Sequence, residues 1–249
     1  MNPTEKTHYD YLPIIGGTHF TTITHSDKQW NQYYALCERH AVDTMIGRVK
    51  GGIVLDVGSS YGHWFSFLKH KGFDTILGVE LDPQRAKIAQ EAGYTQVFNC
   101  DASQIPYPSN TIDVAVSNDV FVHILRIEDK IAVLKEIERL LKPGGMFILN
   151  HAMSPAFGFR QYHVQEYCSF LTLHEFIALV LENTTMRISD IKPTYYNFRN
   201  PEPPRITQFL RRYITLPLIP KLLFFADYLR ARDLSLEDSD YVYIKAIKK

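Results

Sequence analysis

The chain has 249 residues, of which 45% are apolar and 22% charged, and its 27 basic residues balance its 27 acidic ones. A net charge near zero argues against a dedicated nucleic-acid binder, which usually carries a basic surplus. No run reaches the roughly 18 apolar residues of a membrane span, and the N-terminus lacks the pattern of a secretory signal. The three cysteines, Cys37, Cys100 and Cys168, have no metal-knuckle spacing. These features predict a cytoplasmic globular protein without a metal.

Short apolar runs alternate with amphipathic stretches along the chain. A helix is expected first, at residues 29–48. Strands are then predicted at 53–57, 76–80, 96–99, 112–117, 146–150, 186–196 and 241–249, and helices at 63–71, 83–91, 128–141 and 172–182. Pro83 opens one of these helices, and Gly72 and Gly93 follow the ends of two. Strands that alternate with helices predict parallel βαβ units in a doubly wound α/β sheet.

The same pattern predicts a single domain over residues 1–249. Its core is expected at 51–196, after an N-terminal helical addition at 1–50. Residues 197–240 hold five prolines and are expected to form an insertion that covers a substrate, before a final strand at 241–249.

The segment from Asp56 to Gly62 lies where the first strand of the core turns into a helix. Ligands of open α/β sheets bind off the carboxyl ends of the strands, so this loop is the natural cofactor site. Its glycines let the backbone approach a ligand closely. Glu80 follows Gly58 by 22 residues and ends the next strand, where a carboxylate can accept both hydroxyls of a ribose.

Two other chemistries use a loop of this kind. A dinucleotide fingerprint needs G-x-G-x-x-G, but Ser60 and His63 stand where its second and third glycines belong. Gly58, Ser60 and Gly62 also match the G-x-S-x-G elbow of serine hydrolases. That fold places several strands before the elbow, and too few residues precede Gly58 here. A hydrolase using Ser60 remains the less favoured alternative.

The third interpretation rests on five motifs in order, at 54–62 (VLDVGSSYG), 78–83 (GVELDP), 100–107 (CDASQIPY), 113–118 (DVAVSN) and 141–146 (LKPGGM). With these motifs, the sequence resembles the class I S-adenosylmethionine-dependent methyltransferases, of the small-molecule type, over roughly residues 53–196. Ser60 departs from the family's usual middle glycine. The resemblance implies a Rossmann-like, mostly parallel seven-stranded sheet with helices on both faces, and S-adenosylmethionine as cofactor.

The family also implies roles for single residues. Glu80 would hold the ribose hydroxyls, Leu81 would pack on adenine, and Asp101 would accept the adenine amino group. The amide of Ala102 would serve a ring nitrogen, while Asn118 would lie beside the sulfonium. Asp56 would organise the turn or meet the cofactor's ammonium group. The backbone of the glycine-rich loop would face the amino-acid end, through Gly58, Ser59, Ser60 and Gly62.

Methyl transfer needs an aligned acceptor and, for a hydroxyl acceptor, a general base. His123 follows the fourth strand and His151 the fifth, so both are expected at the rim of the site and are the catalytic candidates. His163 is a further candidate. Asp119 either orients one of these histidines or, as we expect more, caps a helix before Val120.

Segments outside the sheet are expected to select the acceptor. The aromatic arm at residues 8–20 is a candidate lid, and the apolar, arginine-flanked stretch at 206–232 is expected to cover a substrate or to pack on the sheet. Peripheral lipid contact through this stretch is a further interpretation. A small-molecule acceptor is favoured over nucleic acid, because residues 118–121 read NDVF rather than the Asn/Asp-Pro-Pro-aromatic motif of exocyclic-amine methyltransferases. The chain is expected to be a monomer or a homodimer.

Two classes of function therefore remain. The first is an active methyltransferase with a small-molecule acceptor, with O-methylation slightly favoured because rim histidines are available. The second is a binding protein that holds S-adenosylmethionine without turnover. Both require Glu80 and Asp101, and only the enzyme requires His123 or His151.

Overall fold

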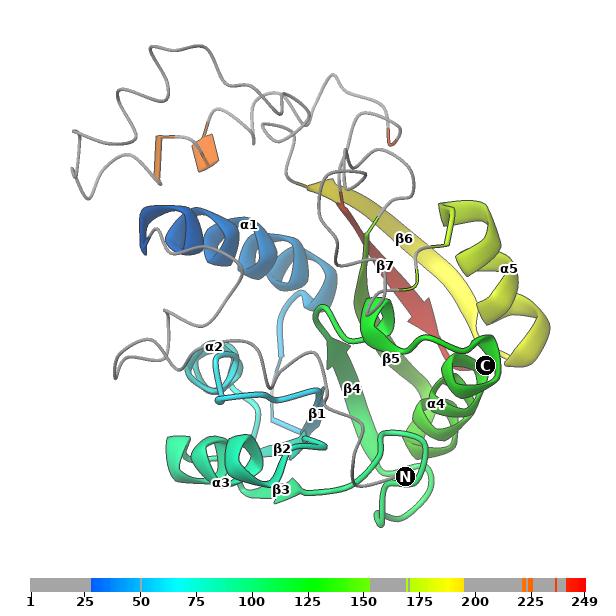
Figure 1. The fold of residues 1–249 in the computed structure, drawn as a ribbon, viewed down its shortest axis with the longest axis horizontal. Helices are drawn as coiled ribbons and strands as arrows, with labels where there is room; N and C mark the ends of the chain where they lie inside the picture. Colours follow the sequence, from blue (N-terminus) through cyan, green and yellow to red (C-terminus); the bar gives the residue numbers. More distant parts are fainter. Residues whose placement is uncertain are drawn as a thin grey trace.

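The computed structural model of the chain describes residues 28–49, 51–152, 169, 171–194, 221–222, 224–225, 236 and 241–249. Within this part, a seven-stranded sheet has the order β3-β2-β1-β4-β5-β7-β6 (Figure 1). The strands are β1 (Ile53–Val57), β2 (Thr75–Val79), β3 (Gln96–Phe98), β4 (Ile112–Ser117), β5 (Leu141–Ala152), β6 (Arg187–Thr194) and β7 (Tyr241–Ile247). The pairs among β1 to β5 are parallel, and β7 runs antiparallel to both neighbours. The predicted α/β sheet is confirmed.

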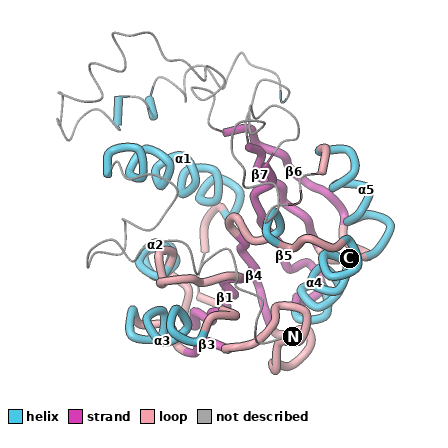
Figure 2. Tube along the Cα trace, in the orientation of Figure 1, coloured by secondary structure: helices cyan, strands magenta, loops and turns pink. Residues whose placement is uncertain are grey.

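Helices cover both faces of the sheet (Figure 2). They are α1 (Lys28–Ile46), α2 (Phe65–Lys71), α3 (Pro83–Ala92), α4 (Ile127–Leu140) and α5 (Leu173–Asn183). Alternate strand residues point to opposite faces, so each face has a core of its own. Val54 and Ile148 pack with α1, α2 and α3, whereas Leu55 and Phe147 pack with α4 and α5.

Helix ends follow the local sequence signals. Asp82 caps α3 by accepting hydrogen bonds from the backbone N–H groups of Gln84 and Arg85, at 2.8 and 2.9 Å. Thr172 and Glu175 form a reciprocal capping box at the start of α5. Such caps satisfy N–H groups that have no partner within the helix, which explains why both starts lie within a residue of the predicted ones.

Two predicted starts shift by more than one residue. Helix α2 begins at Phe65 rather than residue 63, because residues 60–64 form turns. Strand β5 begins at Leu141 rather than residue 146. The register shifts between its pairings at Ile112 and Val114, so residues 142–145 are accommodated as an irregularity inside the strand.

Helix α1 is fixed by three lysines that reach its C-terminal turn. The Nζ atom of Lys245 on β7 donates to the backbone oxygen of Met45 at 2.7 Å, and Lys71 on α2 donates to the backbone oxygen of Gly47 at 2.6 Å. Lys192 on β6 donates to Thr44 Oγ1 at 3.0 Å. Positive charge at a helix C-terminus satisfies free carbonyls and opposes the helix dipole. These three hydrogen bonds hold α1 against the sheet and α2.

Some predicted features lie outside the described residues. These are the arm at 8–20, His163 and nearly all of the stretch at 206–232. Among the residues that are described, none of the helices has the length and apolar character needed to cross a membrane.

Candidate functional site

The loop after β1 closes tightly over the end of β2. The backbone N–H groups of Gly58 and Ser59 both donate to the carbonyl oxygen of Val79, at 2.8 and 2.9 Å. Gly58 has φ +77°, and a Cβ there would lie 2.3 Å from Cγ2 of Val120, the third residue after β4. A larger residue would clash at this point. Glycine at position 58 therefore allows the first loop and the end of β4 to meet.

Ser60 has a backbone conformation that favours glycine. Its φ is +48°, in the left-handed region, which costs a residue with a side chain about 1 kcal/mol. Its backbone N–H donates to Glu80 Oε2 at 2.9 Å. The hydrogen bond holds Ser60 in this conformation and joins the loop to the end of β2.

Glu80 is buried, with 8% of its surface exposed. Its Oε1 accepts a hydrogen bond from the backbone N–H of Asp82 at 3.0 Å, while Oε2 accepts the one from Ser60. A carboxylate has about four acceptor positions, so each oxygen can accept one more donor. This arrangement fits a vicinal diol such as that of a ribose. Leu81, beside it, is 49% exposed and offers an apolar surface for a flat ring.

Asp101 lies on the loop that follows the neighbouring strand β3. Its Oδ1 accepts hydrogen bonds from the backbone N–H and the hydroxyl of Ser103, at 2.8 and 2.7 Å. The side-chain amide of Asn99 donates to the carbonyl oxygens of Glu80 and Leu81, both at 2.9 Å. Asn99, which sequence reasoning missed, therefore ties the two strand ends that carry Glu80 and Asp101.

Asp56 is buried under the loop, and the hydroxyl of Tyr94 donates to its Oδ2 at 2.5 Å. Burial raises the pKa of Asp56 to about 7, although the hydrogen bond from Tyr94 acts in the opposite direction. The carboxyl group thus changes charge near neutral pH. Tyr94 is a second residue that sequence reasoning missed, because it lies 38 residues away along the chain.

The ends of β4, β5 and β7 share a polar cluster. Tyr243 donates its hydroxyl hydrogen bond to Asn118 Oδ1. The backbone N–H of Asp119 donates to Asn150 Oδ1 at 2.6 Å, and the amide of Asn150 donates back to Asp119 Oδ1 at 2.8 Å. The expected cap before Val120 is not observed, because the short 3₁₀ helix at Phe121–His123 has no side-chain cap and Asp119 binds Asn150 instead.

His151 is buried against α5. Its Nε2 lies 2.8 Å from the carbonyl oxygen of Leu171, and its ring stacks on Phe176 with centroids 4.6 Å apart. Burial lowers the pKa of His151 to about 4, so the ring is neutral at pH 7. Since the carbonyl oxygen can only accept, Nε2 carries the hydrogen and Nδ1 is the basic nitrogen. His123 is half-buried on the 3₁₀ turn after β4.

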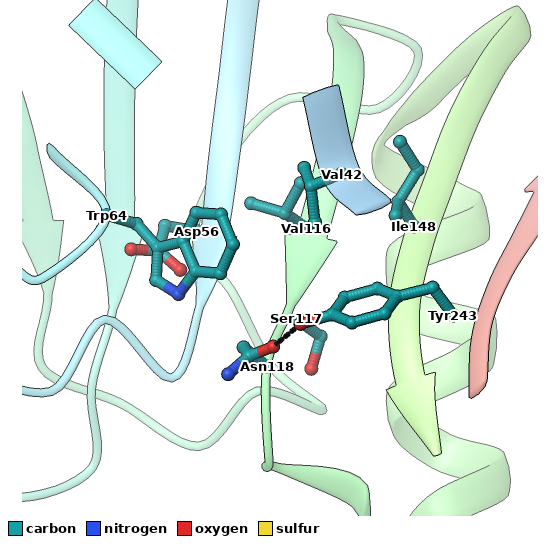
Figure 3. Close-up of a pocket in the computed structure, with 8 residues that line it drawn as sticks. All are labelled: Val42, Asp56, Trp64, Val116, Ser117, Asn118, Ile148 and Tyr243. Atoms are coloured by element: carbon teal, nitrogen blue, oxygen red, sulfur yellow. Dashed lines mark hydrogen bonds between the residues drawn. The ribbon is translucent and has the colours of Figure 1, made fainter. Parts of the chain in front are cut away.

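Several of these groups line one narrow pocket (Figure 3). Asp56 and Asn118 lie on its wall, together with Ser117, whose buried hydroxyl has no hydrogen-bond partner among the described residues. The remaining lining side chains are Val42, Trp64, Val116, Ile148 and Tyr243. The pocket therefore places a carboxyl group and an unpaired hydroxyl at the carboxyl ends of β1 and β4, beside the loop that starts at Gly58.

These groups fit S-adenosylmethionine. Glu80 has acceptor capacity for a diol, Leu81 offers an exposed apolar face, and the carboxylate of Asp101 is open to solvent. The unpaired hydroxyl of Ser117 and the carboxyl of Asp56 suit the polar amino-acid end. Of the predicted site residues, Ser60 and Glu80 are joined by a hydrogen bond, and Asp56 and Asn118 line the same pocket.

Comparisons with known proteins find methyltransferases. Residues 55–149 match the family model described as a methyltransferase domain. Over these residues the chain is similar to S-adenosylmethionine-dependent class I methyltransferases. The match runs from the middle of β1 into β5 and so contains the glycine-rich loop, Glu80, Asp101 and Asn118. The cofactor of this family is S-adenosylmethionine.

Curated relatives span several acceptors. The tRNA (carboxymethyluridine(34)-5-O)-methyltransferase of Macaca fascicularis is 30% identical over 145 residues, which are 58% of this chain and 19% of that protein. The demethylmenaquinone methyltransferase of Bacillus licheniformis is 30% identical over 119 residues, 45% of this chain and 50% of that protein. The chain thus spans half or less of the length of these two relatives.

Solved structures share the fold at low identity. A methyltransferase from Mesorhizobium loti superposes with a TM-score of 0.60 at 17% identity, covering 87% of this chain and 100% of that one. The geranyl diphosphate C-methyltransferase from Streptomyces coelicolor, crystallised with S-adenosyl-L-homocysteine, gives 0.61 at 14% identity, covering 96% and 91%. At this identity the likeness concerns the fold alone.

Proposed function

We propose that the protein is an S-adenosylmethionine-dependent methyltransferase that transfers a methyl group to a small-molecule acceptor. The observation that carries the proposal is the hydrogen bond from the backbone N–H of Ser60 to Glu80 Oε2. It holds the glycine-rich loop and the diol-binding carboxylate together at the carboxyl ends of β1 and β2. Glu80 and Leu81 bind the nucleoside half of the cofactor, and the loop from Gly58 to Gly62 borders its amino-acid end.

The domain's own contribution to the reaction is alignment. Bound S-adenosylmethionine supplies a methyl group on a positively charged sulfur, which is a good leaving group. The chain has to hold an acceptor in line with that group and exclude water. The ends of β4 and β5 border the position of the acceptor, and the paired hydrogen bonds between Asp119 and Asn150 fix these two ends to each other.

O-methylation is slightly favoured because two histidines follow β4 and β5. A hydroxyl acceptor has to lose a proton, and a neutral imidazole can take it. His151 is neutral at pH 7, and its fixed Nε2–H leaves Nδ1 as the proton acceptor. A pKa of about 4 makes His151 a weak base, so its effect depends on close contact with the acceptor. His123, half-buried on the neighbouring turn, is the second candidate base.

A tRNA acceptor is the second candidate, and one observation favours it. The relative matched over 145 residues is a tRNA methyltransferase that acts at a 5-O position. The balanced charge of the chain and its NDVF segment after β4 favour a small molecule instead. Other relatives include a dimethylglycine and a phosphoethanolamine N-methyltransferase, which act on small molecules.

The experiment is transfer of a labelled methyl group from S-adenosylmethionine to separated small-molecule, tRNA and protein fractions of a cell extract. Label in the small-molecule fraction, reduced by His123→Gln or His151→Gln, supports the proposal. Label found only in tRNA, or only in protein, would contradict the small-molecule acceptor and assign that class of acceptor instead. Cofactor binding without transfer to any fraction makes the chain a non-catalytic binding protein. If the cofactor does not bind at all, the Ser60 hydrolase is tested with activated esters.

A further inference from the structure

The loop between β3 and β4 carries Asp101 and Ala102, yet residues 99–111 contain no helix or strand. Asp101 stabilises a turn of its own, because Oδ1 binds Ser103 and its carbonyl oxygen accepts the N–H of Gln104 at 3.0 Å. This turn fixes the local shape, and Asn99 fixes the start of the loop relative to Glu80. Neither contact holds the part of the loop that follows Asp101, which is held from α4.

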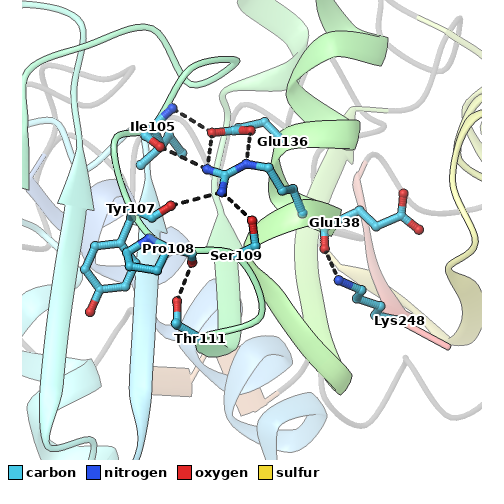
Figure 4. Close-up of polar contacts among 9 residues, drawn as sticks. Ile105, Tyr107, Pro108, Ser109, Thr111, Glu136, Glu138 and Lys248 are labelled. Atoms are coloured by element: carbon cyan, nitrogen blue, oxygen red, sulfur yellow. Dashed lines mark hydrogen bonds and ion pairs between the residues drawn. The ribbon is translucent and has the colours of Figure 1, made fainter.

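An ion pair on α4 provides that contact (Figure 4). Glu136 and Arg139 form a two-point pair, with Nε–Oε2 at 2.7 Å and Nη2–Oε1 at 2.8 Å. Glu136 Oε1 accepts the backbone N–H of Ile105 at 2.7 Å, and Arg139 Nη2 donates to the carbonyl oxygen of Ile105 at 3.0 Å. The pair therefore holds both backbone groups of Ile105, as a neighbouring strand would.

Arg139 also reaches further along the loop. Its Nη1 donates to the carbonyl oxygen of Tyr107 at 3.0 Å and to Ser109 Oγ at 2.8 Å. A guanidinium group has five N–H donors in a fixed plane, and all five are used here. A lysine has three donors on one nitrogen and cannot reproduce this planar set.

The electrostatics favour the pair. Burial by itself would raise the pKa of Glu136, but the hydrogen bonds from Arg139 and from the Ile105 amide outweigh burial and lower it. The hydrogen bond to Glu136 raises the pKa of Arg139. Both groups are therefore charged at neutral pH, and the side chain of Glu136 is only 11% exposed.

We propose that Arg139, through its contacts with Glu136, Ile105 and Tyr107, is a positioning residue that sets the place of Asp101 for recognition of the adenine amino group. This inference rests on the proposed function. Ile105, four residues after Asp101, is buried beneath the loop with 2% of its surface exposed, so a shift at Ile105 passes directly to the turn. Arg139 itself does not touch the cofactor and acts through the loop.

The test compares two ligands that differ at one adenine position. S-adenosylhomocysteine has the 6-amino group that Asp101 would accept, and S-inosylhomocysteine has an oxygen there. Affinities for both ligands are measured by calorimetry on the wild type and on Arg139→Lys, Glu136→Gln and Asp101→Asn. Lys142→Gln is the matched control, because Lys142 forms a 2.6 Å ion pair with Asp113 and has no hydrogen bond to residues 101–110.

The wild type should prefer S-adenosylhomocysteine, and Arg139→Lys should reduce that preference about tenfold, the size expected for one hydrogen bond to a charged group. Asp101→Asn should remove the same preference, and Lys142→Gln should keep it. A general loss of stability would weaken both ligands equally and leave the ratio unchanged, which would overturn the inference. An unchanged ratio in folded Arg139→Lys and Glu136→Gln would overturn it as well. If the wild type binds neither ligand, the proposed function fails instead.

Discussion

The buried carboxyl of Asp56 should make the stability of the protein depend on pH in a way that one substitution removes. Its folded pKa is about 7, against 3.8 for the ordinary value. The folded state therefore binds a proton that the unfolded state has released between these two values. Stability is then lost as the pH rises from about 4 to about 7. Asp56→Asn keeps the shape and the acceptor for Tyr94 but cannot ionise.

The size of the effect follows from the two pKa values. One unit corresponds to about 1.36 kcal/mol, so the loss between pH 5 and pH 8 is about 2.5 kcal/mol. Asp56 is 1% exposed, and solvent screening does not reduce this figure substantially. For a chain of this size, the loss corresponds to roughly 5–10 °C in the unfolding midpoint.

The assay is thermal unfolding of both proteins from pH 5 to pH 8. The difference between the midpoints of Asp56→Asn and the wild type should grow with pH over this range. Using the difference removes the titration of every group that the two proteins share. Two curves that run parallel from pH 5 to pH 8 would refute the assignment of a raised pKa to Asp56.

Three further substitutions test the site. Ser60→Gly should stabilise the protein by about 1 kcal/mol in urea unfolding, because glycine adopts the φ of +48° without strain, and a loss of stability would contradict this explanation. Tyr243→Phe should lower the free energy of unfolding by about 1–2 kcal/mol, because Asn118 loses a buried donor; an unchanged urea midpoint would argue against that hydrogen bond. The pKa of about 4 for His151 means that the unfolded state gains a proton below about pH 6.5 and the folded state does not. Relative to His151→Gln, the wild type should therefore lose about 2 kcal/mol between pH 7 and pH 5, and equal slopes would contradict the lowered pKa.

The sheet could be predicted because its signals are local. Apolar runs such as residues 53–57 and 112–117 are buried strands, and Pro83 and Gly93 mark helix ends. Glu80 could be predicted for the same reason, because it comes directly after a predicted strand at a known distance from the loop. The start of β5 could not, since a Lys-Pro-Gly-Gly segment has the composition of a turn and only its pairing with β4 makes it part of a strand.

The partners of the site residues could not be predicted, because they come from distant parts of the chain. Tyr243 lies 125 residues from Asn118, and Tyr94 lies 38 residues from Asp56. Arg139 has the spacing of an ordinary exposed helix residue, and its contacts with Ile105 and Tyr107 depend on how the loop folds back on α4. The sequence suggested a helix cap for Asp119, and the fold places Asn150 within its reach instead.

The central claim is that Glu80 and the loop at Ser60 form the cofactor site. The most direct measurement is calorimetric titration of the wild type and of Glu80→Gln with S-adenosylhomocysteine and with NAD. Glu138→Gln is the matched control, because that carboxylate also accepts a backbone N–H, from Thr185 at 2.6 Å, and lies on α4. The account predicts that S-adenosylhomocysteine binds and NAD does not. Glu80→Gln should weaken binding by about 10- to 100-fold, the range for a hydrogen bond to a charged group, and Glu138→Gln should not. Binding of NAD alone, or equal affinity in the wild type and Glu80→Gln, would contradict it.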